Sequence, residues 1–134
     1  MVIITTDNQR IVEVGTSTIM FSLYSTVKIL LRRKTSKIKT AKDFLKTGNC
    51  DHKNAIICAR ELNLVRDFLS RYSPEKAIWD CNDLSVLPPW YNNLSPVITS
   101  CANLFTTADG KDLLYELVSI LTYAGITGCS VESH

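Results

Sequence analysis

The chain has 134 residues, a length that fits one folded domain. Hydrophobic residues make up 46% and charged residues 21%, proportions of an ordinary globular protein that exclude a disordered chain. The N-terminus lacks the basic and apolar regions of a signal peptide, and no apolar run is long enough to span a bilayer. The five cysteines follow no framework spacing. We therefore expect a cytoplasmic protein with reduced thiols and no membrane partner.

The net charge of +2 hides an uneven distribution. Residues 28–53 carry nine basic and two acidic side chains, whereas residues 54–134 carry five basic and nine acidic ones. A fold that separates these segments would present two different electrostatic faces.

In chain order, the first predicted elements are two β-branched runs over residues 2–5 and 10–14, which indicate a hairpin. Apolar residues at helical spacing predict a helix from Thr16 or Ser17 to about Arg33. A capping-box-like start at Thr40 predicts a short helix that ends near Gly48. The clearest helix follows Asp51, with one apolar stripe made of Ala55, Cys58, Leu62, Val65, Leu69 and Tyr72.

The second half is predicted to begin with a buried strand over residues 77–79 and a loop over 82–93. A short helix over 95–102, a strand over 103–106, a helix from Asp109 to Gly125 and an edge strand over 129–131 complete the chain. The element order predicts a single α+β domain over residues 1–134. We expect about four helices packed on a small, mostly antiparallel sheet.

No cluster of residues indicates an enzyme. Cys50, His52 and Cys58 have part of a metal-site spacing, but no second ligand pair completes a structural zinc site. Nothing marks an activated thiol beside His52 either. We therefore expect no metal and no cofactor.

The carboxylates have simpler explanations than catalysis. Asp80 and Asp83 flank a turn that they can cap, and Asp112 and Glu116 are neighbours on a helix surface. The spacing around Gly110 does not fit a phosphate loop. We therefore expect a protein that is not an enzyme, and a small enzyme with an unrecognised site is the weakest of three hypotheses.

Residues 73–113 contain all four prolines and both tryptophans. Aromatic side chains beside rigid turns commonly build binding surfaces. Trp79 lies in an apolar run and is predicted to be a core residue, whereas core and binding roles both stay open for Trp90.

The same region contains Trp79-Asp80, Pro88-Pro89-Trp90, the stretch 92–100 (Asn-Asn-Leu-Ser-Pro-Val-Ile-Thr-Ser) and Gly110-Lys111-Asp112-Leu113. With a weaker similarity at 15–17 and 25–26, these residues resemble the immunity protein 70 family, which comprises small bacterial proteins encoded beside polymorphic or contact-dependent growth-inhibition toxins. Tyr91 departs from the resemblance, because a glycine is expected after the Pro-Pro-Trp sequence. The resemblance implies a non-enzymatic inhibitor whose partner is the C-terminal domain of a cognate toxin, commonly a nuclease.

Acidic side chains beside the Trp90-Tyr91 pair would complement the basic substrate cleft of a nuclease. The predicted toxin-binding residues are Asp80, Asp83, Trp90, Tyr91, Asn92, Asn93, Asp109, Lys111, Asp112 and Glu116.

The alternative hypothesis is a small nucleic-acid-binding or regulatory protein that uses the basic segment 32–46. No aromatic residue lies between Val27 and Asp43 to stack on a base, so this segment is predicted to be a solvated face.

Overall fold

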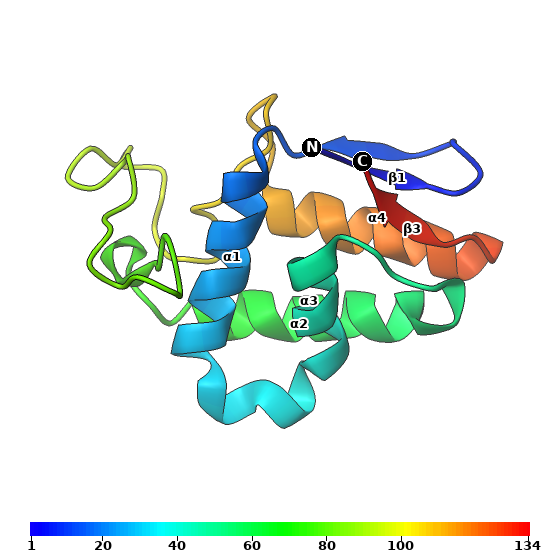
Figure 1. Cartoon of the computed structure of the whole chain (residues 1–134), viewed down its shortest axis with the longest axis horizontal. Helices are drawn as coiled ribbons and strands as arrows, with labels where there is room; N and C mark the ends of the chain where they lie inside the picture. The colour runs from blue at the N-terminus through cyan, green and yellow to red at the C-terminus, as the bar shows by residue number, and fades with distance from the viewer.

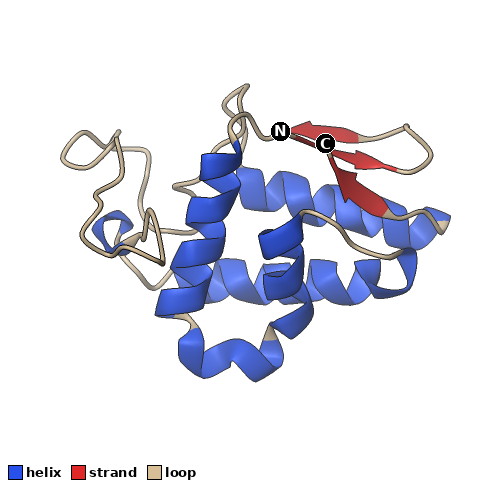
Figure 2. Cartoon of the chain, viewed as in Figure 1, coloured by secondary structure: helices blue, strands red, loops and turns tan.

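The computed structural model describes residues 1–134 and contains four helices and one three-stranded antiparallel sheet (Figures 1 and 2). The predicted α+β class, with about four helices and a small sheet, is confirmed. The strands are β1 (Val2–Thr5), β2 (Ile11–Glu13) and β3 (Val131–Ser133), and the helices are α1 (Ser17–Leu30), α2 (Lys39–Thr47), α3 (Ala55–Leu69) and α4 (Leu113–Thr127). Three short 3-10 helices, η1 (Arg32–Lys37), η2 (His52–Asn54) and η3 (Pro74–Lys76), connect them.

The sheet brings the two ends of the chain together, because β1 lies between β2 and β3 (Figure 1). Ile3 pairs with Val12 on one side and with Ser133 on the other. The β1–β2 hairpin, predicted from its β-branched runs, is tied to α4 through its turn. There the Tyr123 hydroxyl donates to Asp7 Oδ2 at 2.7 Å.

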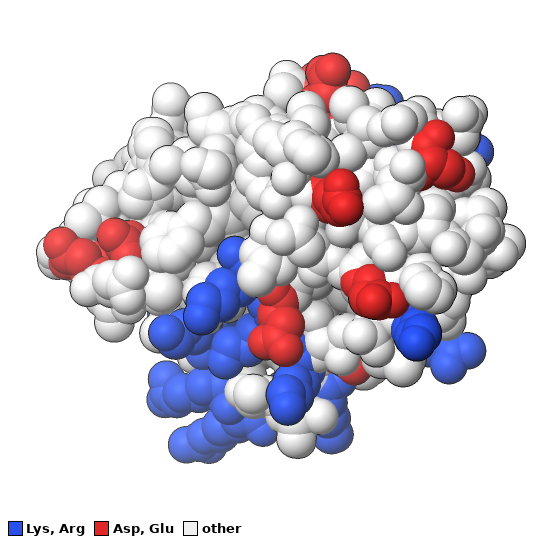
Figure 3. Space-filling model, turned by 45° about the vertical axis from the view of Figure 1, so that its right-hand side comes forward, with Lys and Arg blue, Asp and Glu red and all other residues white.

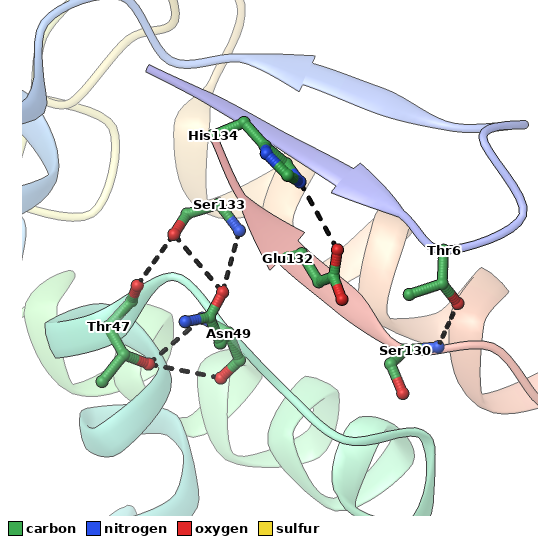
Figure 4. Close-up of polar contacts among 7 residues, drawn as sticks. All are labelled: Thr6, Thr47, Asn49, Ser130, Glu132, Ser133 and His134. Carbon is green, nitrogen blue, oxygen red and sulfur yellow. Dashed lines mark hydrogen bonds and ion pairs between the residues drawn. The ribbon is translucent and has the colours of Figure 1, made fainter.

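Strand β3 is hydrogen-bonded to the segment that connects α2 and α3 (Figure 4). Ser133 donates its backbone N–H to Asn49 Oδ1 at 2.9 Å and its hydroxyl to the Thr47 carbonyl at 3.0 Å. Gly48, at φ +75°, lies so close that an added Cβ would be 2.6 Å from Ser133 Cβ. The strand lies two residues later than predicted, because Gly128 at φ +77° first turns the chain out of α4.

Helices α3 and α4 run antiparallel and form the largest helix pair of the core (Figure 1). The predicted stripe of α3 is buried except for Tyr72, which is half-buried and lies just beyond the helix. The sequence predicts that Gly125 ends the last helix, but in the structure this glycine lies inside α4. A Cβ at Gly125 would be 2.4 Å from Ile56 Cγ1, so this glycine lets the two helices approach closely.

The remaining helix ends differ modestly from the prediction. Helix α1 ends at Leu30 and gives way to η1, so the chain is not α-helical to Arg33. Helix α2 has no side-chain cap at its start. Asp51, predicted to cap the long helix, caps η2 just before α3 instead: its Oδ1 accepts from the Lys53 N–H at 2.9 Å, and the N-cap residue of α3 itself, Asn54, makes no side-chain cap bond. No helix combines the length and the apolarity needed to cross a membrane.

The largest errors fall in residues 77–106, where no strand at 77–79 or 103–106 and no helix at 95–102 forms. Thr106 makes only an isolated bridge with Asp112. Local side-chain bonds replace the expected helix, since Asn103 Oδ1 accepts from the N–H groups of Thr99 and Ser100. The segment is therefore one long loop, at the left of Figure 1.

Candidate functional site

Three hydroxyl groups of α1 anchor the start of the loop. Thr26 Oγ1 accepts from the Ile78 N–H at 2.9 Å and donates to the Ile78 carbonyl at 3.1 Å, and Ser22 donates to the same carbonyl at 2.8 Å. Ser25 Oγ accepts from the Cys81 N–H at 3.0 Å. All three hydroxyl-bearing residues are fully buried. The backbone of residue 78 thus has the pairing that a strand neighbour would have supplied, which explains why no strand forms.

The end of the loop is fixed beyond α3. The Cys101 N–H donates to the Tyr72 carbonyl at 3.0 Å, and its thiol donates to the Ser73 carbonyl at 3.3 Å. Burial raises the pKa of the Cys101 thiol to about 12, so this group stays protonated and structural. With both ends held, the loop projects from the body as a defined unit.

An aromatic cluster supports the loop from inside. Trp79 and Trp90 meet edge to face with ring centroids 5.1 Å apart, and Trp90 meets the buried Phe105 in the same way at 6.2 Å. Both tryptophans are half-buried, so the prediction of Trp79 as a core residue is wrong. Trp90 therefore connects the loop to the core, and this contact favours a supporting role for it.

Pro88 and Pro89 introduce the turn that presents Tyr91. The Tyr91 N–H donates to the Pro88 carbonyl at 3.0 Å, and the Asn93 N–H donates to the Trp90 carbonyl at 2.9 Å. The left-handed residue of this turn is Asn92, at φ +66°, and not the tyrosine. Asparagine tolerates that conformation, so the turn does not need a glycine at position 91.

Four exposed apolar side chains surround one hollow of the loop, and we call them the loop surface: Leu84, Val86, Leu87 and Tyr91. The hollow has a volume of about 220 Å³ and is also lined by Trp79 and Pro88. Leu84 and Leu87 are 60% and 58% exposed and Tyr91 is 43% exposed. An apolar patch of this kind is typical of an interaction site.

Asp80 and Asp83 each hold a turn beside the loop surface. Asp80 Oδ1 accepts from the Asn82 N–H at 2.8 Å, and Asp83 Oδ1 accepts from the Ser85 hydroxyl at 2.6 Å and from the Ser85 N–H at 3.2 Å. The Ser85 hydrogen bonds lower the pKa of Asp83. Neither carboxylate forms an ion pair, so both keep their negative charge unneutralised.

The other predicted binding residues lie in a separate segment at the start of α4. Asp109, predicted to open the helix, instead accepts from the Thr107 hydroxyl and pairs with Lys111 at 3.4 Å. Asp112 is the cap, since its Oδ1 accepts from the Tyr115 N–H at 3.1 Å, and Glu116 is half-buried in the first turn. In Figure 1 this segment forms the turn at the top of the molecule, away from the tip of the loop. The ten predicted residues therefore form two groups.

The metal-like spacing of Cys50, His52 and Cys58 does not form a ligand cluster, and no group of three or more candidate metal ligands occurs. His52 Nδ1 lies 3.1 Å from Asp51 Oδ1. Cys58 is fully buried and its thiol donates to the Thr40 carbonyl at 3.9 Å. The neighbouring Cys50 thiol and burial both raise the pKa of Cys58.

Sequence reasoning missed most of the loop surface and its anchors. Leu84, Val86 and Leu87 looked like an ordinary loop because exposure is not visible in a residue string. The hydroxyls of Ser22 and Thr26 gave a signal, since they interrupt an apolar helix on the side that is buried. A buried hydroxyl needs a partner, and a loop backbone supplies it here.

Comparison with known proteins gives one match. The family model described as Immunity protein 70 matches residues 4–132, nearly the whole chain. Searches of curated proteins and of solved structures return no match. The matched range includes both loop anchors, the loop surface and the start of α4. The chain therefore belongs to the Immunity protein 70 family.

Proposed function

We propose that this protein binds a toxin domain through the loop surface and neutralises it by covering its active site or the path of its substrate. Family membership supports the general role of an immunity protein. The choice of the loop surface as the binding site rests on one observation. Of the eleven large hydrophobic side chains exposed in the chain, four line the single hollow of the loop surface. A monomer gains nothing by exposing them, whereas an interface core is built from such side chains.

The anchoring of the loop supports high affinity. A loop held by α1 hydroxyls at one end and by Tyr72 and Ser73 at the other loses little conformational entropy when a partner binds. Tyr91 adds a large side chain with few rotatable bonds, next to a turn fixed by two prolines. These are the properties of a hot-spot residue.

The charge beside the loop surface supports a nuclease as the target. Asp80 and Asp83 form no ion pair, and the one lysine that lines the hollow, Lys76, is accompanied there by Glu75. A nuclease cleft that holds phosphates is basic, so these carboxylates would speed association and disfavour other partners. Inhibition by occupancy requires no catalytic group in this chain, and we expect the purified protein to hydrolyse neither nucleic acid nor esters.

The test uses the cognate toxin domain, which the family leads us to expect in a neighbouring gene. Tyr91→Ala should raise the Kd for the toxin about 30-fold, corresponding to about 2 kcal/mol, with almost no change in melting temperature. Tyr115→Ala is the matched control, because Tyr115 is an exposed tyrosine of α4 beside the other group of predicted residues. It should leave the Kd unchanged.

The double variant Asp80→Asn plus Asp83→Asn should mainly slow association and flatten its dependence on salt. A nuclease assay, titrated with each variant, should give inhibition constants in the same order as the Kd values. If Tyr115→Ala weakens binding and Tyr91→Ala does not, the toxin docks at the start of α4 and the proposal is wrong.

A further inference from the structure

A basic groove lies between η1 and the C-terminal end of α3, apart from the loop surface. It has a volume of about 630 Å³, and none of the four residues of the loop surface lines it. Its cations are Arg32, Arg33, Lys34 and Arg71, and its apolar wall includes Phe68 and Tyr72. Figure 3 shows Lys and Arg side chains gathered at the lower end of the molecule, where Figure 1 places the turn after α1.

The charge of the basic groove is only partly neutralised within the protein. No acidic side chain lines it, and the only ion pair made by its residues joins Arg71 to Asp67 at 3.2 Å. The ends of α1 and α3 face this region, and each helix C-terminus offsets about half a positive charge. About two positive charges remain. Uncompensated charge of this density opposes folding through self-repulsion and favours an anionic ligand.

The wall of the basic groove supplies the aromatic ring that the basic segment itself lacks. Phe68 comes from α3 and is half-buried, with Lys34 Nζ 5.3 Å and Arg71 Cζ 5.9 Å from its ring centroid. The Tyr72 hydroxyl donates to the Leu30 carbonyl at 3.2 Å, which holds the two sides of the groove together. An aromatic ring among cations is the combination with which proteins hold single-stranded nucleic acid.

We infer that the basic groove binds single-stranded nucleic acid, with phosphates on the cations of η1 and a base against Phe68. The volume lies within the range of pockets that hold a ligand of nucleotide size. A planar base uses both the ring and the cations, whereas an acidic peptide would use the cations alone. This binding is additional to toxin neutralisation and does not depend on it.

The test measures fluorescence anisotropy of a short labelled single-stranded RNA of mixed sequence, over a series of salt concentrations. The triple variant Arg32→Gln, Arg33→Gln, Lys34→Gln should lose affinity about tenfold or more at low salt. Its slope of log affinity against log salt should fall by about two. The matched control, Lys39→Gln, Lys42→Gln, Lys46→Gln, removes the same charge from α2 outside the groove and should lose less than about threefold.

A second variant separates stacking from charge. Phe68→Leu keeps an apolar side chain but removes the ring, and it should lower RNA affinity about tenfold with the salt slope unchanged. Three results would each overturn the inference: no binding of RNA by the wild-type protein, an equal loss in the two triple variants, or competition by polyglutamate as effective as that by unlabelled RNA. The melting temperature of every variant serves as the folding control, and unchanged toxin affinity in the η1 triple variant separates this inference from the proposed function.

Discussion

The anchor between α1 and the loop can be tested by removing one hydroxyl. Thr26→Val keeps the shape of the side chain, so it leaves almost no cavity. It removes both hydrogen bonds between Thr26 and Ile78. The Ile78 carbonyl keeps its bond from Ser22, but the Ile78 N–H loses its side-chain acceptor. An unsatisfied, partly buried amide costs about 1–2 kcal/mol, so we expect the free energy of unfolding to fall by that amount.

The partner substitution gives the comparison. Ser22→Ala should cost only about 0.5–1 kcal/mol, because the Ile78 carbonyl retains the bond from Thr26. The double variant removes both donors to that carbonyl. Its cost should therefore exceed the sum of the single costs by about 1 kcal/mol.

Urea denaturation measures these differences, and the m-value should stay constant. Thr26→Ser, which keeps the hydroxyl, is the control and should lose less than Thr26→Val. Strict additivity, or a Thr26→Val cost below about 0.5 kcal/mol, would refute the anchoring argument. A loop freed in this way should also bind toxin more weakly, because binding would then have to order it.

Three further predictions concern the body of the protein. Gly125→Ala gains about 1 kcal/mol of helix propensity but overpacks against the Ile56 side chain at a larger cost, so the melting temperature should fall. The loss should shrink in an Ile56→Ala background, where only the close approach to the backbone N of residue 56, at 3.2 Å, remains. Hydrogen bonds lower the pKa of Asp7: the largest effect comes from the Thr5 hydroxyl, and smaller ones come from the Gln9 N–H and the Tyr123 hydroxyl. Its stabilising effect is therefore present at neutral pH and is lost progressively as the pH falls from about 4 through the lowered pKa of Asp7, so the stability difference between wild type and Asp7→Asn should shrink over that range. In the folded protein a thiol reagent should modify Cys81 and Cys129, whereas the three buried cysteines should react only after denaturation.

The regular elements were predictable because their sequence patterns match their burial. The stripe of α3 repeats at helical spacing and is the side that the core buries. The hairpin of β1 and β2 follows from its β-branched runs. Errors at helix ends have a tertiary cause, since the packing partner of a helix decides whether a glycine ends that helix. Gly125 stays helical because Ile56 requires the close approach, and Gly128 takes the left-handed turn instead.

The candidate site was only partly predictable. The sequence by itself indicated the family, the loop with its prolines and tryptophans, and the uneven charge. Only the tertiary structure decided that residues 77–79 form no strand, because hydroxyls from α1, more than fifty positions earlier in the chain, take the place of a neighbouring strand. It likewise brought Phe68 beside Lys34. Spacing in a sequence reports which residues share one face of one element, whereas a contact between elements depends on how the whole core packs.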